Sequence, residues 1–270
     1  MKFTVLTDDK AKKRGFLAEH GLSLFIEYKD CNILFDTGQS DVYIRNAKVS
    51  QLDLNKTDYI VLSHGHYDHC GGISYLPELK KNPKIYVQET ALKNKYAINP
   101  DGKSYREIGI PWSADNYCLA LINGNMKISD DIALLGSIPS TVEFEEIPKG
   151  FFIKNGNDMS ADMIDDEQML IFNTNNGLVI FLGCSHLGII NCLHYALKQF
   201  PGKKIDTVVA GMHLDNVNPL RLQLTMQHLI DLEVRKLYPL HCTGIVASSE
   251  MKKFLGEKCS ILYAGDSVEI

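Results

Sequence analysis

Three histidines and one aspartate lie within six consecutive residues of this chain. They are His64, His66, Asp68 and His69, and a glycine separates the first two. Neutral imidazole and carboxylate are ligands that suit zinc, iron or manganese. One ion cannot easily take four ligands from so short a segment, whereas two ions can share them. The spacing therefore predicts a metal site, with the first two histidines on one ion and the other pair on a second.

A short apolar run over residues 59–62 precedes this group and predicts a buried strand that delivers it. Gly65 lies inside the group, and Gly71 and Gly72 follow it. Because glycine lets the backbone turn sharply, neighbouring side chains can converge on one point. We therefore expect residues 63–72 to form a tight loop at the end of a strand.

Three further predicted strands each run straight into a short polar segment that holds one histidine. These histidines are His186, His213 and His241. Ligands gather beyond the carboxyl ends of strands in layered α/β folds, so we predict metal or substrate contact for all three. His194 and His228 fall inside predicted helices instead, and we assign both to packing or to the surface.

The remaining pattern predicts a mixed chain of strands and helices. In the first part we expect strands and one short helix, followed by a second helix that begins near residue 71 and ends or bends at 76–77. The strands are expected at 2–7, 22–28, 32–36 and 85–87, and the short helix at 41–48.

From residue 169 onward, strands alternate with helices, which indicates helices packed outside a sheet. The predicted strands are 169–173, 178–182, 207–210 and 236–240, and the predicted helices are 188–200, 219–232 and 247–255. We expect the chain to close with a pair of strands at 261–263 and 267–270.

The segment between these two parts, about 91–165, is the least periodic and is rich in turn sequences. Within it we predict strands at 132–135 and 151–154. We interpret 91–118 as an insertion that covers the site, because active-site lids are often drawn from such segments. The alternative is that residues 91–118 form an ordinary surface loop with no role at the site.

Composition narrows the class of protein. The chain has 270 residues, of which 45% are hydrophobic and 23% charged, as is usual for a globular protein. Its net charge of −5 argues against nucleic acid as a partner, and no apolar run is long enough to span a membrane. Seven scattered cysteines do not form a disulfide framework, so we expect a cytoplasmic location. The oligomeric state stays open.

The spacing of His64, His66, Asp68 and His69 resembles the HxHxDH signature of the metallo-β-lactamase superfamily. The resemblance implies an α/β fold of the α+β kind, a four-layer αββα sandwich with a dinuclear metal site at one end of its two sheets. It also implies that residues 1–270 form a single domain of this fold.

Six segments, in order along the chain, are similar to one subgroup of that superfamily. This subgroup includes the 7,8-dihydropterin-6-methyl-4-(β-D-ribofuranosyl)aminobenzene-5′-phosphate synthases. The segments are residues 19–23, 36–40, 63–72, 183–189, 211–214 and 241–244. His20, in the first segment, lies beside a predicted strand and is expected either to line the pocket or to have a structural role.

The chain departs from the usual superfamily pattern at one position. A bridging aspartate commonly follows a glycine there, whereas Gly183 is followed by Cys184. A cysteine ligates zinc as a thiolate, although Cys184 is also interpreted as a small buried residue beside the site, and an acidic residue of the preceding loop is another substitute. The candidates for this ligand are Cys184, Asp165, Asp166 and Glu167.

The resemblance implies a metal-dependent hydrolase that acts on a small-molecule ester, amide or phosphoester. Two divalent ions, zinc by default with iron or manganese as alternatives, would activate a hydroxide. Asp68 would orient the hydroxide or take its proton, and His213 would donate a proton or contact an anion. One ion would be held by His64, His66 and His186, and the other by Asp68, His69 and His241.

Two alternatives remain. The subgroup resemblance motivates a synthase that joins a ribosyl phosphate to an aminobenzoate-like ring. The other alternative is a non-catalytic metal-binding or sensing protein, which the nearly complete ligand set disfavours. Iron redox chemistry with a flavin partner domain and nuclease activity both rank lower, because neither a flavin domain nor a basic surface is evident in the sequence.

Overall fold

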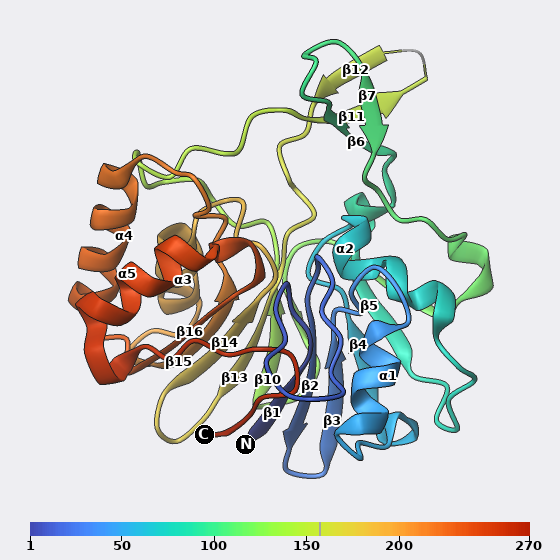
Figure 1. The fold of residues 1–270 in the computed structure, drawn as a ribbon, viewed down its shortest axis with the longest axis horizontal. Helices are drawn as coiled ribbons and strands as arrows, with labels where there is room; N and C mark the ends of the chain where they lie inside the picture. Colours follow the sequence, from blue (N-terminus) through green and yellow to red (C-terminus); the bar gives the residue numbers. More distant parts are fainter. Residues whose placement is uncertain (157) are drawn as a thin grey trace. The chain divides into compact units, whose positions relative to one another are not determined.

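In the computed structural model, which describes residues 1–156 and 158–270, the chain folds as two compact units. Unit 1 consists of Met1–Asn123, Pro148–Asp166 and Tyr263–Ile270. Unit 2 consists of Gly124–Ile147 and Glu167–Leu262. Figure 1 shows the helices and strands of both units.

A seven-stranded sheet forms the larger part of unit 1, with strand order β17-β1-β2-β3-β4-β5-β8. Its strands are β1 (Lys2–Thr7), β2 (Ser23–Tyr28), β3 (Cys31–Phe35), β4 (Tyr59–Val61), β5 (Lys84–Gln88), β8 (Leu119–Ile122) and β17 (Ser267–Glu269). Strands β3, β4, β5 and β8 are parallel. The segments that follow β3 and β4 therefore leave the sheet at the same end, beyond the carboxyl ends of these strands.

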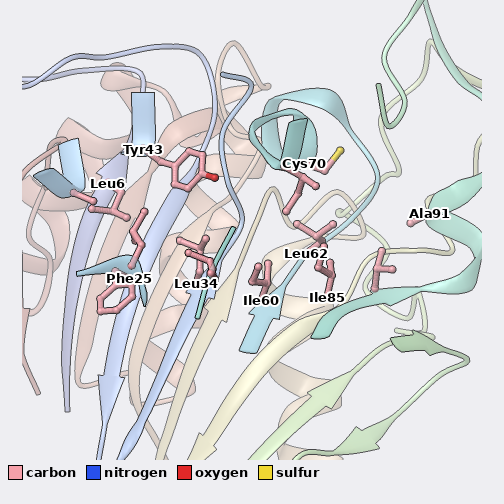
Figure 2. Packing of buried hydrophobic residues seen from close by; sticks show 14 residues of the cluster. Leu6, Phe25, Leu34, Tyr43, Ile60, Leu62, Cys70, Ile85 and Ala91 are labelled. Atoms are coloured by element: carbon pink, nitrogen blue, oxygen red, sulfur yellow. The ribbon is translucent and has the colours of Figure 1, made fainter. Parts of the chain in front are cut away.

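Helix α1 (Val42–Val49) and the short helix α2 (Tyr67–Cys70) accompany this sheet, and a 3₁₀ turn, Gly71–Tyr75, continues α2. A cluster of fourteen buried residues packs these helices against the sheet (Figure 2). Leu34, Ile60 and Ile85 come from three adjacent strands, Tyr43 from α1 and Cys70 from α2. The core thus anchors both ends of the predicted metal loop, its strand and its helix.

The helix predicted to begin near residue 71 is present as the 3₁₀ turn Gly71–Tyr75, with Leu76 as its C-cap, but the α-helical turn α2 before it, from Tyr67, was not predicted. Gly71 and Gly72 serve close packing. A Cβ atom on Gly71 would lie 2.8 Å from the carbonyl oxygen of Gln39, and one on Gly72 would collide with that of Thr37. These glycines let the turn after α2 lie directly against the backbone that follows β3.

A second, four-stranded sheet of unit 1 has the order β12-β11-β6-β7 and is antiparallel throughout. Its strands are β6 (Lys95–Ile98), β7 (Tyr105–Glu107), β11 (Phe151–Asn155) and β12 (Asp158–Ala161). Only β11 was predicted. β7 is exposed along its whole length and shows no alternation of apolar and polar residues, so it gives no sequence signal.

Unit 2 is built on a six-stranded sheet with the order β16-β15-β14-β13-β10-β9. Its strands are β9 (Met126–Lys127), β10 (Ile132–Leu135), β13 (Met169–Asn173), β14 (Leu178–Leu182), β15 (Ile205–Gly211) and β16 (Lys236–Leu240). The helices α3 (Ile189–Gln199), α4 (Pro219–Asp231) and α5 (Ile245–Leu255) lie on one face of this sheet (Figure 1). The predicted alternation of strand and helix is confirmed.

The closing pair of strands was predicted only in part. β17 pairs with β1, with Phe3 opposite Val268, but residues 261–263 form no strand. Tyr263 and Asp266 close a turn instead, in which the N–H of Tyr263 donates to Asp266 Oδ2 and that of Asp266 to the Tyr263 carbonyl. Within the described residues, no helix combines the length and the apolar composition that crossing a membrane requires.

Candidate metal centre

The loop after β4 gathers all four ligand candidates predicted from its spacing. His64, His66, Asp68 and His69 are all buried. The ring centroid of His64 lies 4.5 Å from that of His66 and 4.3 Å from that of His69. Asp68 Oδ2 lies 3.6 Å from His69 Nε2. The loop therefore concentrates three imidazoles and a carboxylate in one small volume of unit 1.

Gly65 sits at the tightest point of this loop. A Cβ atom there would collide with the carbonyl oxygen of Ala91. The Gly65 N–H donates to Asp166 Oδ2 at 2.7 Å. His66, the next residue, is extended and packs its ring against Phe151 of β11, with 5.1 Å between centroids. The contacts with Asp166 and Phe151 place the segment that contains the small sheet against the histidine loop.

Asp36 orients two of the loop histidines from the end of β3. Its Oδ2 accepts hydrogen bonds from the Ser63 hydroxyl and from Nδ1–H of His69, each at 2.7 Å. Because the Ser63 hydroxyl donates its one hydrogen to Asp36, its oxygen must accept from Nδ1–H of His64 at 2.9 Å. Both imidazoles are thereby fixed in the tautomer whose lone pair is on Nε2. This is the arrangement found around metal-ligating histidines.

A buried lysine lies behind the loop. Lys95 Nζ donates to Asp162 Oδ2 at 2.6 Å and to Asp166 Oδ1 at 2.8 Å, and no part of its side chain is exposed. Burial lowers the pKa of Lys95, but the two carboxylates outweigh it and raise the pKa above its usual value. Lys95 therefore carries a charge in the interior.

Carboxylates outnumber this cation around the loop. Burial raises the pKa of the Cys70 thiol well above its usual range, and the negative charges of Asp68, Asp36 and Asp166 raise it further. Lys95 is the one lysine or arginine among the buried residues that the structure describes. A divalent cation at the histidines would balance this excess of negative charge.

His20, whose role was left open, stands at the edge of the loop. Its Nε2 lies 3.3 Å from Asp68 Oδ2 and its Nδ1 lies 3.4 Å from Asp9 Oδ2. The His20 side chain is 56% exposed. It therefore links a buried carboxylate of the loop to solvent.

In unit 2, the three predicted histidines follow the neighbouring parallel strands β14, β15 and β16. Glu167 supports His186, since its Oε1 accepts from the backbone N–H at 2.7 Å and from Nδ1–H at 3.1 Å. Burial alone raises the pKa of Glu167, but these hydrogen bonds and the imidazole lower it below its usual value. The ring centroids of His186 and His213 are 4.8 Å apart.

The backbone at these strand ends adopts an uncommon conformation. Ser185, His213 and His241 have φ angles of 50°, 48° and 45°, in the left-handed region that few residues other than glycine adopt. Such residues cluster at functional sites, where the surrounding structure holds them in place. Two of the three histidines that we predict to contact metal or substrate, His213 and His241, thus have this strained backbone conformation.

Two cysteines lie beside these histidines. The His213 N–H donates to Cys242 Sγ at 3.3 Å. Burial raises the pKa of Cys242, but the hydrogen bond with Cys184 and the charges of His241 and His186 outweigh it and lower the pKa to about 6. The surroundings of Cys242 therefore favour its thiolate form more than those of an ordinary cysteine do.

The proposed substitutes for the bridging carboxylate have other partners. Asp165 is exposed and pairs with Lys93 at 2.8 Å. Asp166 binds Lys95 and Gly65, and Glu167 binds the segment of His186, as described above. Two further predictions are confirmed: His194 lies in α3 and His228 in α4, where their rings pack 6.3 Å apart.

Unit 1 also contains a cavity of about 420 Å³ beside α2. Its lining includes the aromatic residues Tyr67, Tyr96 and Trp112 and the charged residues Lys93, Lys95 and Glu107. Tyr67 belongs to the histidine loop itself, and Trp112 Nε1 donates to the Cys70 carbonyl at 2.7 Å. The cavity therefore borders the loop and is large enough for part of a small-molecule ligand.

Several supporting residues carried no assigned role in the sequence. Asp36 lies in a segment that resembles the subgroup, so its position was marked but its function was not. Ser63 adjoins a predicted ligand, and Asp166 was a candidate for the bridging ligand rather than for the supporting role that it has here. Lys95 gave no signal, because nothing in its local sequence distinguishes it from a surface lysine.

Comparison with known proteins agrees with this architecture. The family model of the metallo-β-lactamase superfamily matches residues 18–181. The chain belongs to this superfamily. A crystal structure of Tm1679, described as a metal-dependent hydrolase of the β-lactamase superfamily, is 32% identical and superposes with a TM-score of 0.86 over 100% of this chain and 99% of that one. The predicted metallo-β-lactamase fold is thereby confirmed.

Two relatives come from Methanocaldococcus jannaschii. An uncharacterised protein is 34% identical over 255 residues, covering 92% of this chain and 93% of the relative. A protein named 7,8-dihydropterin-6-methyl-4-(β-D-ribofuranosyl)-aminobenzene-5′-phosphate synthase is 28% identical over 287 residues, covering 99% and 95%. The predicted resemblance to that subgroup is confirmed.

Proposed function

We propose that the chain is a hydrolase that uses two divalent metal ions to cleave a small-molecule ester, amide or phosphoester. One observation carries this proposal: buried carboxylates hold Nδ1 of predicted ligand histidines. Asp36 holds His69 directly and His64 through Ser63, and Glu167 holds His186. Metal-ligating histidines almost always donate their second ring N–H in this way.

The proposed ligands combine imidazoles and one carboxylate, a donor set that fits zinc first and iron or manganese as alternatives. Their pairing follows the superfamily resemblance. The first ion is assigned to His64, His66 and His186, and the second to Asp68, His69 and His241. The same proposal treats residues 1–270 as one domain with a lid within about 91–165, and the cytoplasm as its location.

Bound divalent ions supply Lewis acidity and lower the pKa of water toward neutrality. The chain's own residues would then move the protons. Asp68 Oδ2 accepts a proton from the attacking water and can pass it to His20 Nε2, 3.3 Å away, which is exposed to solvent. His213, half-buried at the end of β15, is the proposed proton donor to the leaving group.

The proposed partner is a small molecule rather than a nucleic acid or a membrane. The cavity beside α2 supports this, because its volume suits a small ligand and its lining combines aromatic residues with two lysines and one glutamate. The tyrosine at position 67 joins this cavity to the histidine loop. A substrate ring packed there would place its reactive group near the loop.

Metal content tests the proposal. Wild-type protein purified without added metal is compared with His66→Ala, His186→Ala and the control His228→Ala, which changes a histidine on α4. About two ions per wild-type chain, partly lost in the first two variants only, would support the pairing. Hydrolysis of a panel of ester, amide and phosphoester substrates should fall with the metal. Protein that binds no zinc, manganese or iron would leave the non-catalytic alternative.

A second candidate is the synthase reaction, favoured by the relative of that name, which aligns along nearly the whole chain. In this reaction a ribosyl phosphate is joined to an aminobenzoate-like ring. Pyrophosphate release from phosphoribosyl pyrophosphate, measured with and without an aminobenzoate, tests it. Release that requires the aminobenzoate and is lost in His66→Ala would favour the synthase over the hydrolase.

A further inference from the structure

Two cysteines from different strands of unit 2 approach each other at one end of the sheet. Cys184 follows β14 and Cys242 follows β16, while β15 lies between these strands. The Sγ atom of Cys242 lies 3.7 Å from the carbonyl oxygen of Cys184. The two Sγ atoms and one ring nitrogen of His241 all lie within 4.8 Å of one another.

Gly211, at the end of the intervening strand, makes this approach possible. A Cβ atom at that position would lie only 2.8 Å from Cys242 Sγ. The same Cβ atom would also collide with the carbonyl oxygen of Gly183. Glycine therefore lets the end of β15 lie directly against the Cys242 thiol and against the backbone that precedes Cys184.

The separation of these three atoms suits one metal ion. Zinc binds thiolate at about 2.3 Å and imidazole at about 2.0–2.1 Å, so tetrahedral ligands lie about 3.5–3.8 Å apart. Atoms that are all within 4.8 Å need to close by about 1 Å, which side-chain rotation can supply. The N–H of His213, which donates to Cys242 Sγ, also favours a thiolate at this position.

We propose that Cys184, His241 and Cys242 form a sulfur-containing metal site in unit 2 that selects zinc or a similarly thiophilic ion. Thiolate ligands favour such ions over manganese and magnesium, which prefer oxygen. The proposal rests on the proposed function only in its use of His241. It places two sulfur ligands beside His241, and these decide which metal this site in unit 2 prefers.

Cadmium binding tests this site directly, because cadmium thiolates absorb in the near ultraviolet whereas cadmium bound to imidazole and carboxylate does not. The metal-free, reduced protein is titrated with Cd²⁺ and its absorption is compared among variants. Cys242→Ser keeps an acceptor for the His213 N–H. Cys118→Ser, which removes an exposed cysteine, is the matched control.

We expect a thiolate band in wild type that falls by about half in Cys242→Ser and in Cys184→Ser, because each removes one of two sulfur ligands. The band should be unchanged in Cys118→Ser and in His66→Ala. A band that is absent in wild type, or unchanged in Cys242→Ser, would overturn the proposal. A band that persists while the histidine loop binds no metal would retain the sulfur site and reject the dinuclear hydrolase.

Alkylation provides a second measurement that needs no variant. Mass spectrometry follows the modification of Cys242 in wild-type protein with Cd²⁺, with Mn²⁺ and without metal. We expect Cd²⁺ to slow modification at least about tenfold and Mn²⁺ to have little effect. Equal protection by both ions, or by neither, would contradict the selectivity that the two sulfur atoms imply.

Discussion

Lys95 Nζ lies 2.8 Å from Oδ1 of Asp166, and both side chains are completely buried. The other oxygen of the same carboxylate accepts the N–H of Gly65. A single aspartate therefore joins a buried cation on the small sheet to the backbone between two predicted metal ligands. The small sheet supports the histidine loop through this contact, in addition to any role as a lid.

Replacing Lys95 by methionine should destabilise the protein by about 3–5 kcal/mol, because two buried carboxylates lose their cation. Chemical denaturation of the metal-free protein measures this change. Lys93→Met is the control, since Lys93 pairs with Asp165 at the partly exposed surface and should cost at most about 1 kcal/mol. Equal costs for both variants would contradict the buried role of Lys95.

Asp36→Asn should weaken metal binding by about 10–100-fold, the usual effect of losing a hydrogen-bond partner behind a ligand. The amide presents an N–H₂ group where His69 and Ser63 now donate, so both loop imidazoles lose their fixed tautomer. Competition with a chromophoric chelator measures the affinity. Asp53→Asn, on an exposed 3₁₀ turn, should leave the affinity unchanged. Unchanged affinity in the Asp36 variant would reject its orienting role.

Gly65→Ala should lower metal affinity at least about tenfold, because the added methyl group collides with the Ala91 carbonyl and displaces the adjacent histidines. Gly102→Ala is a control in open space. Because φ at Gly102 is 67°, alanine there should lower stability by about 1–2 kcal/mol. The metal affinity of the Gly102→Ala protein should nevertheless match that of wild type. Isothermal titration of both metal-free proteins separates these effects. A wild-type affinity in Gly65→Ala would show that the loop tolerates the shift.

Asp206→Asn should lower stability near neutral pH and leave it unchanged in strong acid. Burial raises the pKa of Asp206, but hydrogen bonds from Arg235 and Thr207 outweigh it, so the pKa lies below its usual value. The folded state thus binds this proton more weakly than the unfolded state. The resulting stability is fully present above the unfolded pKa of about 3.9 and is lost as pH falls through the lower folded value.

Thermal unfolding of wild type and this variant between pH 7 and pH 2 measures that dependence. We expect a difference of about 0.2–1 kcal/mol at neutral pH, because Arg235 is half exposed. Asp231→Asn provides the control, since Asp231 accepts a hydrogen bond from the neutral amide of Gln227. A difference that grows in acid would have the wrong sign and would contradict the assignment.

The sequence was sufficient for the loop from His64 to His69, because its ligands are nearly contiguous and follow a recognisable strand. It was also sufficient for the strands and helices of unit 2 from β13 onward, whose apolar patterns are regular, although the two-residue strand β9 was not predicted. The support behind the loop could not be predicted. Lys95 and Asp166 are 71 residues apart, and only the folded chain shows that their charges are buried together.

The small sheet illustrates the same limit for the fold. Its strand β7 is exposed along its length, so burial imposes no alternation on its sequence. What defines that strand is its antiparallel pairing with β6, where Tyr96 lies opposite Glu107, and such pairing requires no apolar pattern in an exposed strand. The spacing of apolar residues shows which face of a strand is buried, so it gives no information about a strand whose two faces are both exposed.

The left-handed backbone at Ser185, His213 and His241 has a consequence for how this protein can change over time. Each position accepts few residue types, because β-branched side chains are strongly disfavoured at these φ angles. Glycine, asparagine and aspartate can follow the backbone, but none provides an imidazole. A saturation library at these three codons should therefore separate two kinds of selection. Variants at Ser185 would be ranked by folding alone, whereas at His241 the few substitutions that fold would lose the chemistry.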